Sequence, residues 1–143
     1  MDSLYLLYGE EKYLLENSLS KLLKEFGEKI NGINFINLDS TNVQNIISDI
    51  ETPAFGYPKK LILVKDSQLF KKQTRGKKGA SSGENKNVSK IAEYIDENIE
   101  MIKESVIIIF VEDEVEKNEL YKVIEKDGTV HEFAKLKLPE IVK

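Results

Sequence analysis

The longest uninterrupted apolar segment of the chain is Val106–Val111 (VIIIFV), with six consecutive apolar residues. A short run without polar interruption predicts a strand that is buried on both faces. Two further runs, Leu4–Tyr8 (LYLLY) and Leu61–Val64 (LILV), share this character. Strands of this kind are typical of parallel sheets covered by helices, so the three runs favour a layered α/β domain.

Between these runs the apolar residues recur at helical spacing, which predicts helices that alternate with the strands. The sets with this spacing are Leu15, Leu19, Leu22, Leu23 and Phe26; Val43, Ile46, Ile47 and Ile50; and Val88, Ile91, Ile95, Ile99 and Ile102. Weaker strands are expected at Ile33–Leu38 and Val130–Phe133. This order predicts three layers, with a mostly parallel sheet, right-handed crossovers and helices on both faces.

Residues that begin or end helices support this division of the chain. Gly27 is expected to end the first helix, and Thr41 with Gln44 forms a capping-box pattern at the start of the second. A short helix is expected after the last apolar run, capped by Asp113 or Glu116, running through Ile124 and closed by Gly128.

The composition excludes several classes of protein. The chain has 143 residues with no Cys and with His131 as its one His. This excludes a disulfide framework and cysteine catalysis, and it argues against zinc sites and His-dependent triads. No apolar run approaches a membrane span and no signal peptide is evident, so we expect a cytoplasmic domain with no membrane partner. The net charge of −4 provides no overall attraction for nucleic acid.

One segment runs against this charge balance. Residues 71–87 contain Lys, Gly, Ser and Asn with no apolar residue except Ala80, which predicts a long flexible loop. Its first part carries the side chains that could contact nucleic-acid phosphates: Lys71, Lys72, Arg75, Lys77 and Lys78. No aromatic residue is interleaved for stacking on bases, and solvated Lys-rich loops are common. A nucleic-acid-binding adaptor that uses this loop is therefore an alternative function.

A nucleotide site would be expected after the first strand of such a domain, but its motif is absent. Gly9 stands in the right place, whereas Leu14 and Leu15 replace the second Gly and the Lys of a P-loop. The acidic residues 112–114 superficially resemble a magnesium-holding segment, yet without a P-loop they have no phosphate to serve, and acids also favour a helix N-terminus. We expect no catalytic residue, no cofactor and no metal, with a degenerate P-loop nucleotide-binding protein as a further alternative.

The segment Thr52–Tyr57 (TPAFGY) places Phe55 and Tyr57 in a short turn bounded by Pro53 and Gly56. Core aromatic residues usually lie inside periodic elements, whereas this turn would present them near the surface. An exposed aromatic residue at a helix end is a candidate anchor for a partner's pocket. Packing into the core is the other interpretation, and the pattern alone favours it.

Three segments together resemble a known family: LYLLYGEEKYLLE at the start, ETPAFGYPKKLILVKD in the middle and VIIIFVEDE later. Their order and spacing are similar to those of the delta subunit of the bacterial DNA polymerase III clamp loader, over essentially all 143 residues. The resemblance implies that residues 1–143 form a degenerate AAA+ (RecA-like) N-terminal domain of a longer chain, without its helical lid and collar domains. The final residues LKLPEIVK read as the start of a further helix.

The resemblance implies a DNA replication subunit that binds the sliding clamp (beta subunit) and stabilises its open form without hydrolysing ATP. Other clamp-loader subunits would be partners, and primed DNA would be reached through the assembled complex. The full-length protein would belong to the polymerase III holoenzyme, a DNA-directed DNA polymerase.

The family's clamp-binding element is a hydrophobic plug just before the third strand. It would fall here on Ala54 and Phe55, with Pro53, Gly56 and Tyr57 around it. Ala54 departs from the family pattern, in which a larger residue is usual. Either Tyr57 compensates for Ala54 or the contact is weaker.

Overall fold

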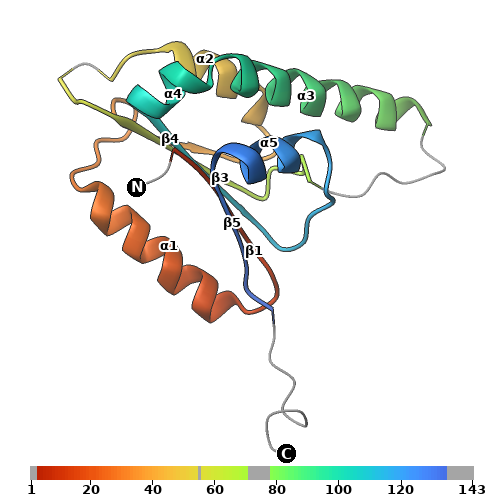
Figure 1. The fold of residues 1–143 in the computed structure, drawn as a ribbon, viewed down its shortest axis with the longest axis horizontal. Coiled ribbons are helices and arrows are strands. Elements are labelled where there is room, and N and C mark those ends of the chain that lie inside the picture. Colours follow the sequence, from red (N-terminus) through yellow and green to blue (C-terminus); the bar gives the residue numbers. More distant parts are fainter. Residues whose placement is uncertain (1–2, 55, 71–77, 135–143) are drawn as a thin grey trace, which may run out of the picture.

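The computed structural model describes residues 3–54, 56–70 and 78–134, with the backbone alone over 78–87. Its centre is a five-stranded sheet in the order β2-β3-β4-β1-β5, and every pair of neighbouring strands is parallel. The strands are β1 (Leu4–Tyr8), β2 (Phe35–Leu38), β3 (Lys60–Lys65), β4 (Val106–Glu112) and β5 (Thr129–Glu132). The three predicted apolar runs are the three inner strands β3, β4 and β1 (Figure 1).

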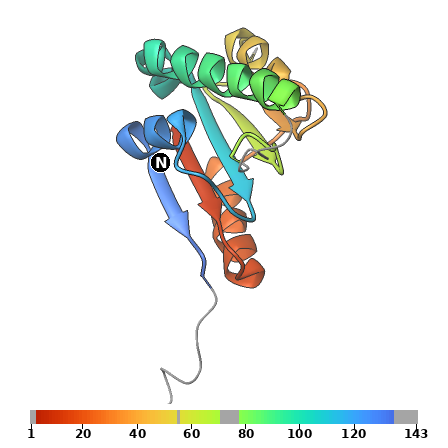
Figure 2. The same ribbon diagram turned by 90° about the vertical axis from the view of Figure 1, so that its right-hand side faces the viewer.

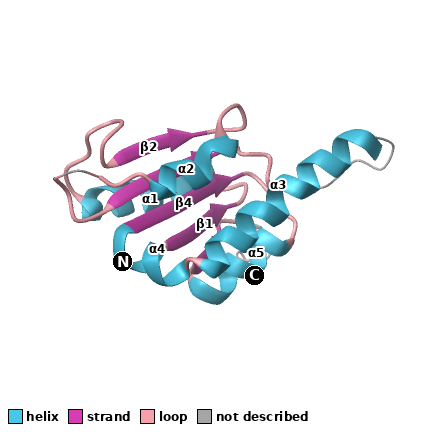
Figure 3. Ribbon diagram, turned by 90° about the horizontal axis from the view of Figure 1, so that it is seen from above, coloured by secondary structure: helices cyan, strands magenta, loops and turns pink. Residues whose placement is uncertain are grey.

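Helices cover both faces of the sheet, as predicted. One face carries α1 (Lys12–Phe26), and the other carries α2 (Ile46–Glu51), α3 (Lys78–Glu97), α4 (Ile99–Ser105) and α5 (Glu119–Asp127) (Figures 1 and 3). A 3₁₀ turn, η1 (Val43–Asn45), precedes α2. Figure 2 shows β1 and β5 side by side at one edge of the sheet. The three-layer α/β class is confirmed, and the strand order is consistent with a RecA/AAA+-like domain.

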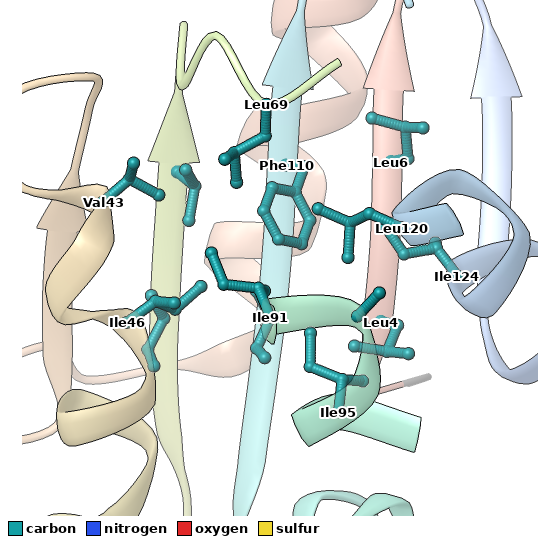
Figure 4. Close-up of a cluster of buried hydrophobic side chains, with 14 of the residues drawn as sticks. Leu4, Leu6, Val43, Ile46, Leu69, Ile91, Ile95, Phe110, Leu120 and Ile124 are labelled. Carbon is teal, nitrogen blue, oxygen red and sulfur yellow. The ribbon is translucent and has the colours of Figure 1, made fainter. Parts of the chain in front are cut away.

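The alternation of side chains along each inner strand divides the core into two clusters. Leu4, Leu6 and Phe110 face α2 to α5, together with Ile91 of α3 and Leu120 of α5 (Figure 4). The intervening strand residues face α1 and pack against Leu15 and Leu19 of that helix in the second cluster: Tyr5, Leu7, Leu61, Leu63, Ile107 and Ile109. Burial on both faces explains why the inner strands read as continuous apolar runs.

The prediction of a loop over residues 71–87 is wrong from Lys78 onward, because the backbone there is the first half of α3. Val88, Ile91 and Ile95 anchor the second half of this helix in the core. A helix that is already nucleated extends at low cost through residues that include no Pro. The basic residues 71–77 lie outside the described part of the chain, and Lys78 is the first residue of α3.

The predicted continuous helix from Val88 to Ile102 is instead two helices. The break is at Asn98, whose side-chain amide donates to the carbonyl oxygen of Tyr94 at 2.8 Å and whose backbone has φ −112°. A side chain that bonds its own backbone competes with the helical ladder. A similar competition from a side chain explains why one predicted helix cap, at Thr41, does not form.

The predicted capping box at Thr41 and Gln44 is wrong. The Thr41 amide and hydroxyl both donate to Asp39 Oδ1, at 2.9 and 2.6 Å, and Thr41 does not cap a helix. At α5 the cap is Asn118, whose Oδ1 accepts from the Tyr121 amide at 3.0 Å, rather than Asp113 or Glu116. The predicted helix ends at Gly27 and Gly128 are confirmed.

Candidate functional site

The connection between α2 and β3, residues 52–59, lies at the amino ends of the strands, because it leads directly into β3 of an all-parallel sheet. Helix α2 ends at Glu51, and the amide and hydroxyl of Thr52 both donate to the carbonyl oxygen of Ser48, at 3.1 and 2.9 Å. Pro53 follows and has no amide hydrogen with which to continue the helix. The local sequence therefore turns the chain outward at this point.

A tight turn follows, closed by the Tyr57 amide, which donates to the Ala54 carbonyl oxygen at 2.9 Å. Gly56 has φ +90°, a conformation that residues with a Cβ rarely adopt. Pro53 and Gly56 are exposed, whereas Ala54 and Tyr57 are half-buried. Phe55 lies outside the described residues. The structure thus brings Pro53, Ala54, Gly56 and Tyr57 together in one surface turn.

Two pockets flank this turn and share Tyr57 as a wall. One, of about 320 Å³, lies between the turn and α4 and includes Pro53, Ala54 and Met101 in its lining. The other, of about 410 Å³, lies toward the end of α1 and includes Phe26. Tyr57 therefore stands between two hollows of the surface, and the turn is accessible from both sides.

Lys60, the first residue of β3, was not identified from the sequence as part of the site. Its side chain is only 3% exposed. Its Nζ donates to the carbonyl oxygen of Asp49 at 2.6 Å and also to that of Thr52. Burial lowers the pKa of Lys60, and the Asp49 carboxylate partly opposes this. The sequence PKKLILV contains no signal that separates a buried Lys from an exposed one at the start of a strand.

At the opposite, carboxyl edge of the sheet, Gly9 occupies the place of a P-loop glycine. Its amide donates to the Asp113 carbonyl oxygen at 3.1 Å, and the Glu11 amide donates to the Phe133 carbonyl oxygen at 2.8 Å. Gly9 has φ +136°, and a Cβ there would lie 2.2 Å from the Phe133 carbonyl oxygen. These amides are engaged by the backbone that follows β4 and β5.

A pocket of about 410 Å³ beside Gly9 is lined by four acidic residues: Glu10, Asp113, Glu114 and Glu132. Asp113 also forms an ion pair with Lys12. Negative charge concentrated in a crevice repels phosphate groups. Among the residues that the structure describes, no group of three or more Asp, Glu or His side chains is placed to hold a metal ion.

His131 stacks on Phe133 with ring centroids 4.2 Å apart and planes 3° from parallel. His131 is otherwise an exposed residue of the edge strand β5. Within the described ranges, no helix is both long and apolar enough to cross a membrane.

Comparison with known proteins gives a family and a fold. The family model described as "DNA polymerase III, delta subunit" matches residues 5–134. Among solved structures, the Bacillus subtilis DNA clamp loader delta protein (YqeN) is similar, with a TM-score of 0.65 and 18% identity over 96% of this chain and 40% of that one. A gamma subunit-related protein of DNA polymerase III from Thermotoga maritima has a TM-score of 0.47 and 12% identity over 98% of this chain and 43% of that one. No curated protein sequence matches. The chain spans about two fifths of the length of the solved structures that it matches.

Proposed function

Because the family model covers residues 5–134, this chain belongs to the DNA polymerase III delta subunit family, and from that premise we propose that it binds the sliding clamp and stabilises its open form. The observation that carries the proposal is this match, which includes the turn between α2 and β3. The partners are the clamp (beta subunit), other clamp-loader subunits and, through the assembled complex, primed DNA. The proposed location of the chain is the cytoplasm. Residues 1–143 act as the N-terminal AAA+-like domain of a longer chain that also has lid and collar domains.

The clamp-binding residue in this proposal is Phe55, with Pro53, Ala54, Gly56 and Tyr57 around it. An aromatic side chain in a partner's pocket buries about 150 Å² or more and is a common hot spot. Tyr57 supplies the apolar surface that Ala54 lacks, since it forms a wall of both flanking pockets. The exposed, hydrogen-bonded turn supports this assignment because it is accessible to a large partner.

The mechanism is differential binding. A subunit that binds the open ring more tightly than the closed ring shifts the equilibrium toward the open ring, by no more than the difference between the two affinities. No chemical step on the clamp is required of this chain. Other subunits of the loader supply ATP binding and control access to the turn.

The absence of ATP hydrolysis by this domain is part of the proposal. It is supported by the acidic pocket beside Gly9 and by the engagement of the Gly9 and Glu11 amides with backbone carbonyl groups. A phosphate site needs backbone amides aimed at the anion and a positive charge close by.

Binding of this chain to the sliding clamp of its own organism, measured by calorimetry, tests the proposal. We expect Phe55→Ala to lower the affinity about tenfold or more, because truncation of a hot spot costs about 2 kcal/mol. Tyr13→Ala is the matched control, since Tyr13 is an aromatic residue of α1 that is 72% exposed and lies near the carboxyl edge of the sheet. Equal binding by wild type and Phe55→Ala would move the site away from Phe55. No binding by the folded wild-type chain would refute the proposed function.

A further inference from the structure

One side chain, that of Lys60, holds both ends of the connection (residues 52–59) that includes the candidate clamp-binding turn. Lys60 begins β3, and alternation along the strand places it on the same face as Ile62 and Val64, which is the face that α2 covers. A Lys that is 3% exposed is unusual, because burial of an ammonium group is costly unless its hydrogen bonds are satisfied. The buried ammonium group of Lys60 therefore requires hydrogen-bond acceptors.

The acceptors are main-chain carbonyl groups at the end of α2. The last four carbonyl groups of a helix have no partner within the helix. Lys60 Nζ donates to the carbonyl oxygen of Asp49, at 2.6 Å, and to that of Thr52. The C-cap of α2 is Thr52 in an extended conformation, with φ −82° and ψ 123°, so no glycine cap supplies these bonds. The strand after the turn thus caps the helix before it.

We infer that Lys60 is a positioning residue for clamp binding: by joining Thr52 to the first residue of β3, it holds both ends of residues 52–59 and presents the turn in its binding conformation. This inference rests on the proposed function. Lys60 itself is buried beneath the turn and makes no contact with the clamp.

The physical basis is preorganisation. A turn that is already ordered loses less conformational entropy on binding, and the apparent affinity scales with the fraction of molecules in the competent conformation. Hydrogen bonds that Lys60 does not touch hold the inner part of the turn, such as that between the Tyr57 amide and Ala54. Removal of the ammonium group should therefore loosen the ends of the connection while the sheet stays folded.

The test compares Lys60→Met, which keeps the length of the side chain but removes its donors, with Lys60→Arg, which keeps charge and donors. Lys65→Met is the matched control, at a half-buried Lys that ends the same strand at the far edge of the sheet. Clamp affinity is measured at a temperature at which each variant is fully folded, so that a loss of global stability alone does not change the dissociation constant. We expect Lys60→Met to weaken binding about fivefold or more, Lys60→Arg to keep most of the affinity, and Lys65→Met to bind as wild type does.

Hydrogen exchange on the same proteins separates positioning from general stability. In Lys60→Met we expect faster exchange at the Thr52 amide, at the end of the connection that Lys60 holds, with unchanged protection at the Tyr57 amide and in β3 and β4. The free wild-type chain supplies a measurement that needs no variant: the Tyr57 amide should already be protected, and clamp binding should add little. An unprotected Tyr57 amide in the free chain would overturn the inference.

The affinities distinguish failure of this inference from failure of the proposed function. If Phe55→Ala weakens clamp binding and Lys60→Met does not, the turn binds the clamp and Lys60 has no positioning role. If neither the wild-type chain nor any variant binds, the proposed function fails and the inference falls with it. Equal weakening in Lys65→Met would also overturn the inference, because the effect would then be one of charge and not of anchoring.

Discussion

The substitution Gly9→Ala tests whether the glycine at the nucleotide-site position is retained for packing. Gly9 has φ +136°, and an added Cβ would lie 2.2 Å from the carbonyl oxygen of Phe133 and 2.7 Å from its nitrogen. No contact of a real Cβ is that short, so the chain after β5 would have to move away from Gly9. That movement would strain the bonds of the Phe133 amide to Tyr8, at 2.7 Å, and of the Glu11 amide to Phe133, at 2.8 Å.

The magnitude follows from these two effects. The backbone conformation alone costs about 1–2 kcal/mol for a residue with a Cβ. Disruption of two backbone hydrogen bonds adds about 1 kcal/mol each. We therefore expect Gly9→Ala to lower the free energy of unfolding by about 3–4 kcal/mol, a large part of the stability of a domain of this size.

Urea denaturation followed by circular dichroism measures the effect, and Gly27→Ala provides the control. Gly27 also has a positive φ, +100°, but a Cβ there would meet no atom within 4 Å. Gly27→Ala should show the conformational cost without the steric one, so the difference between the two variants isolates the contact with Phe133. If both substitutions destabilise the chain equally, the close approach of Gly9 to the end of β5 is refuted.

Two further predictions concern charge. Burial, with smaller contributions from Glu132 and Tyr121, raises the pKa of Tyr8 from 10.0 to about 12. The unfolded chain therefore releases this proton first as the pH rises through this range, and stability falls by no more than about 2 kcal/mol after allowance for partial exposure. Tyr8→Phe should flatten that decline in urea titrations at successive alkaline pH values; a decline of unchanged slope would assign it to another group. For nucleic acid, we expect the chain alone to bind primed DNA weakly, and a variant with Ser at the five basic positions of residues 71–78 to lose most of the salt-sensitive part of that binding. Fluorescence anisotropy over a salt series measures this, and equal affinities would remove the segment as a DNA contact.

The inner strands of the sheet were predictable because burial on both faces leaves a continuous apolar run, as in Val106–Val111. The edge strands were less sharply defined: Ile33–Leu38 was expected, and β2 begins at Phe35. Edge strands are half-exposed, so their composition is closer to that of loops. Composition also failed at residues 78–87, where polar residues extend a helix whose anchor lies further along the chain.

Errors at helix ends came from side-chain competition that a pattern does not reveal. Thr41 has the right spacing for a cap, but Asp39 takes both of its donors. Lys60 was missed for a related reason, since its acceptors are carbonyl oxygens and every residue has one. The turn itself was predictable from Pro53 and Gly56. The proline has a fixed φ and the glycine readily adopts a positive φ, and both effects are local, so they do not depend on the rest of the fold.

The placement of the two edges of the sheet bears on how this domain can change over evolutionary time. The turn before β3 and the crevice beside Gly9 lie at opposite ends of the same strands, about 20 Å apart for a strand of the length of β3. Substitutions at one end leave the backbone of the other in place, so residues beside Gly9 can change without altering the turn before β3. Gly9 is the exception at its end of the strands, because the chain after β5 passes too close for any side chain to replace it. A glycine at that position is therefore required by packing, and it is no sign of affinity for nucleotides.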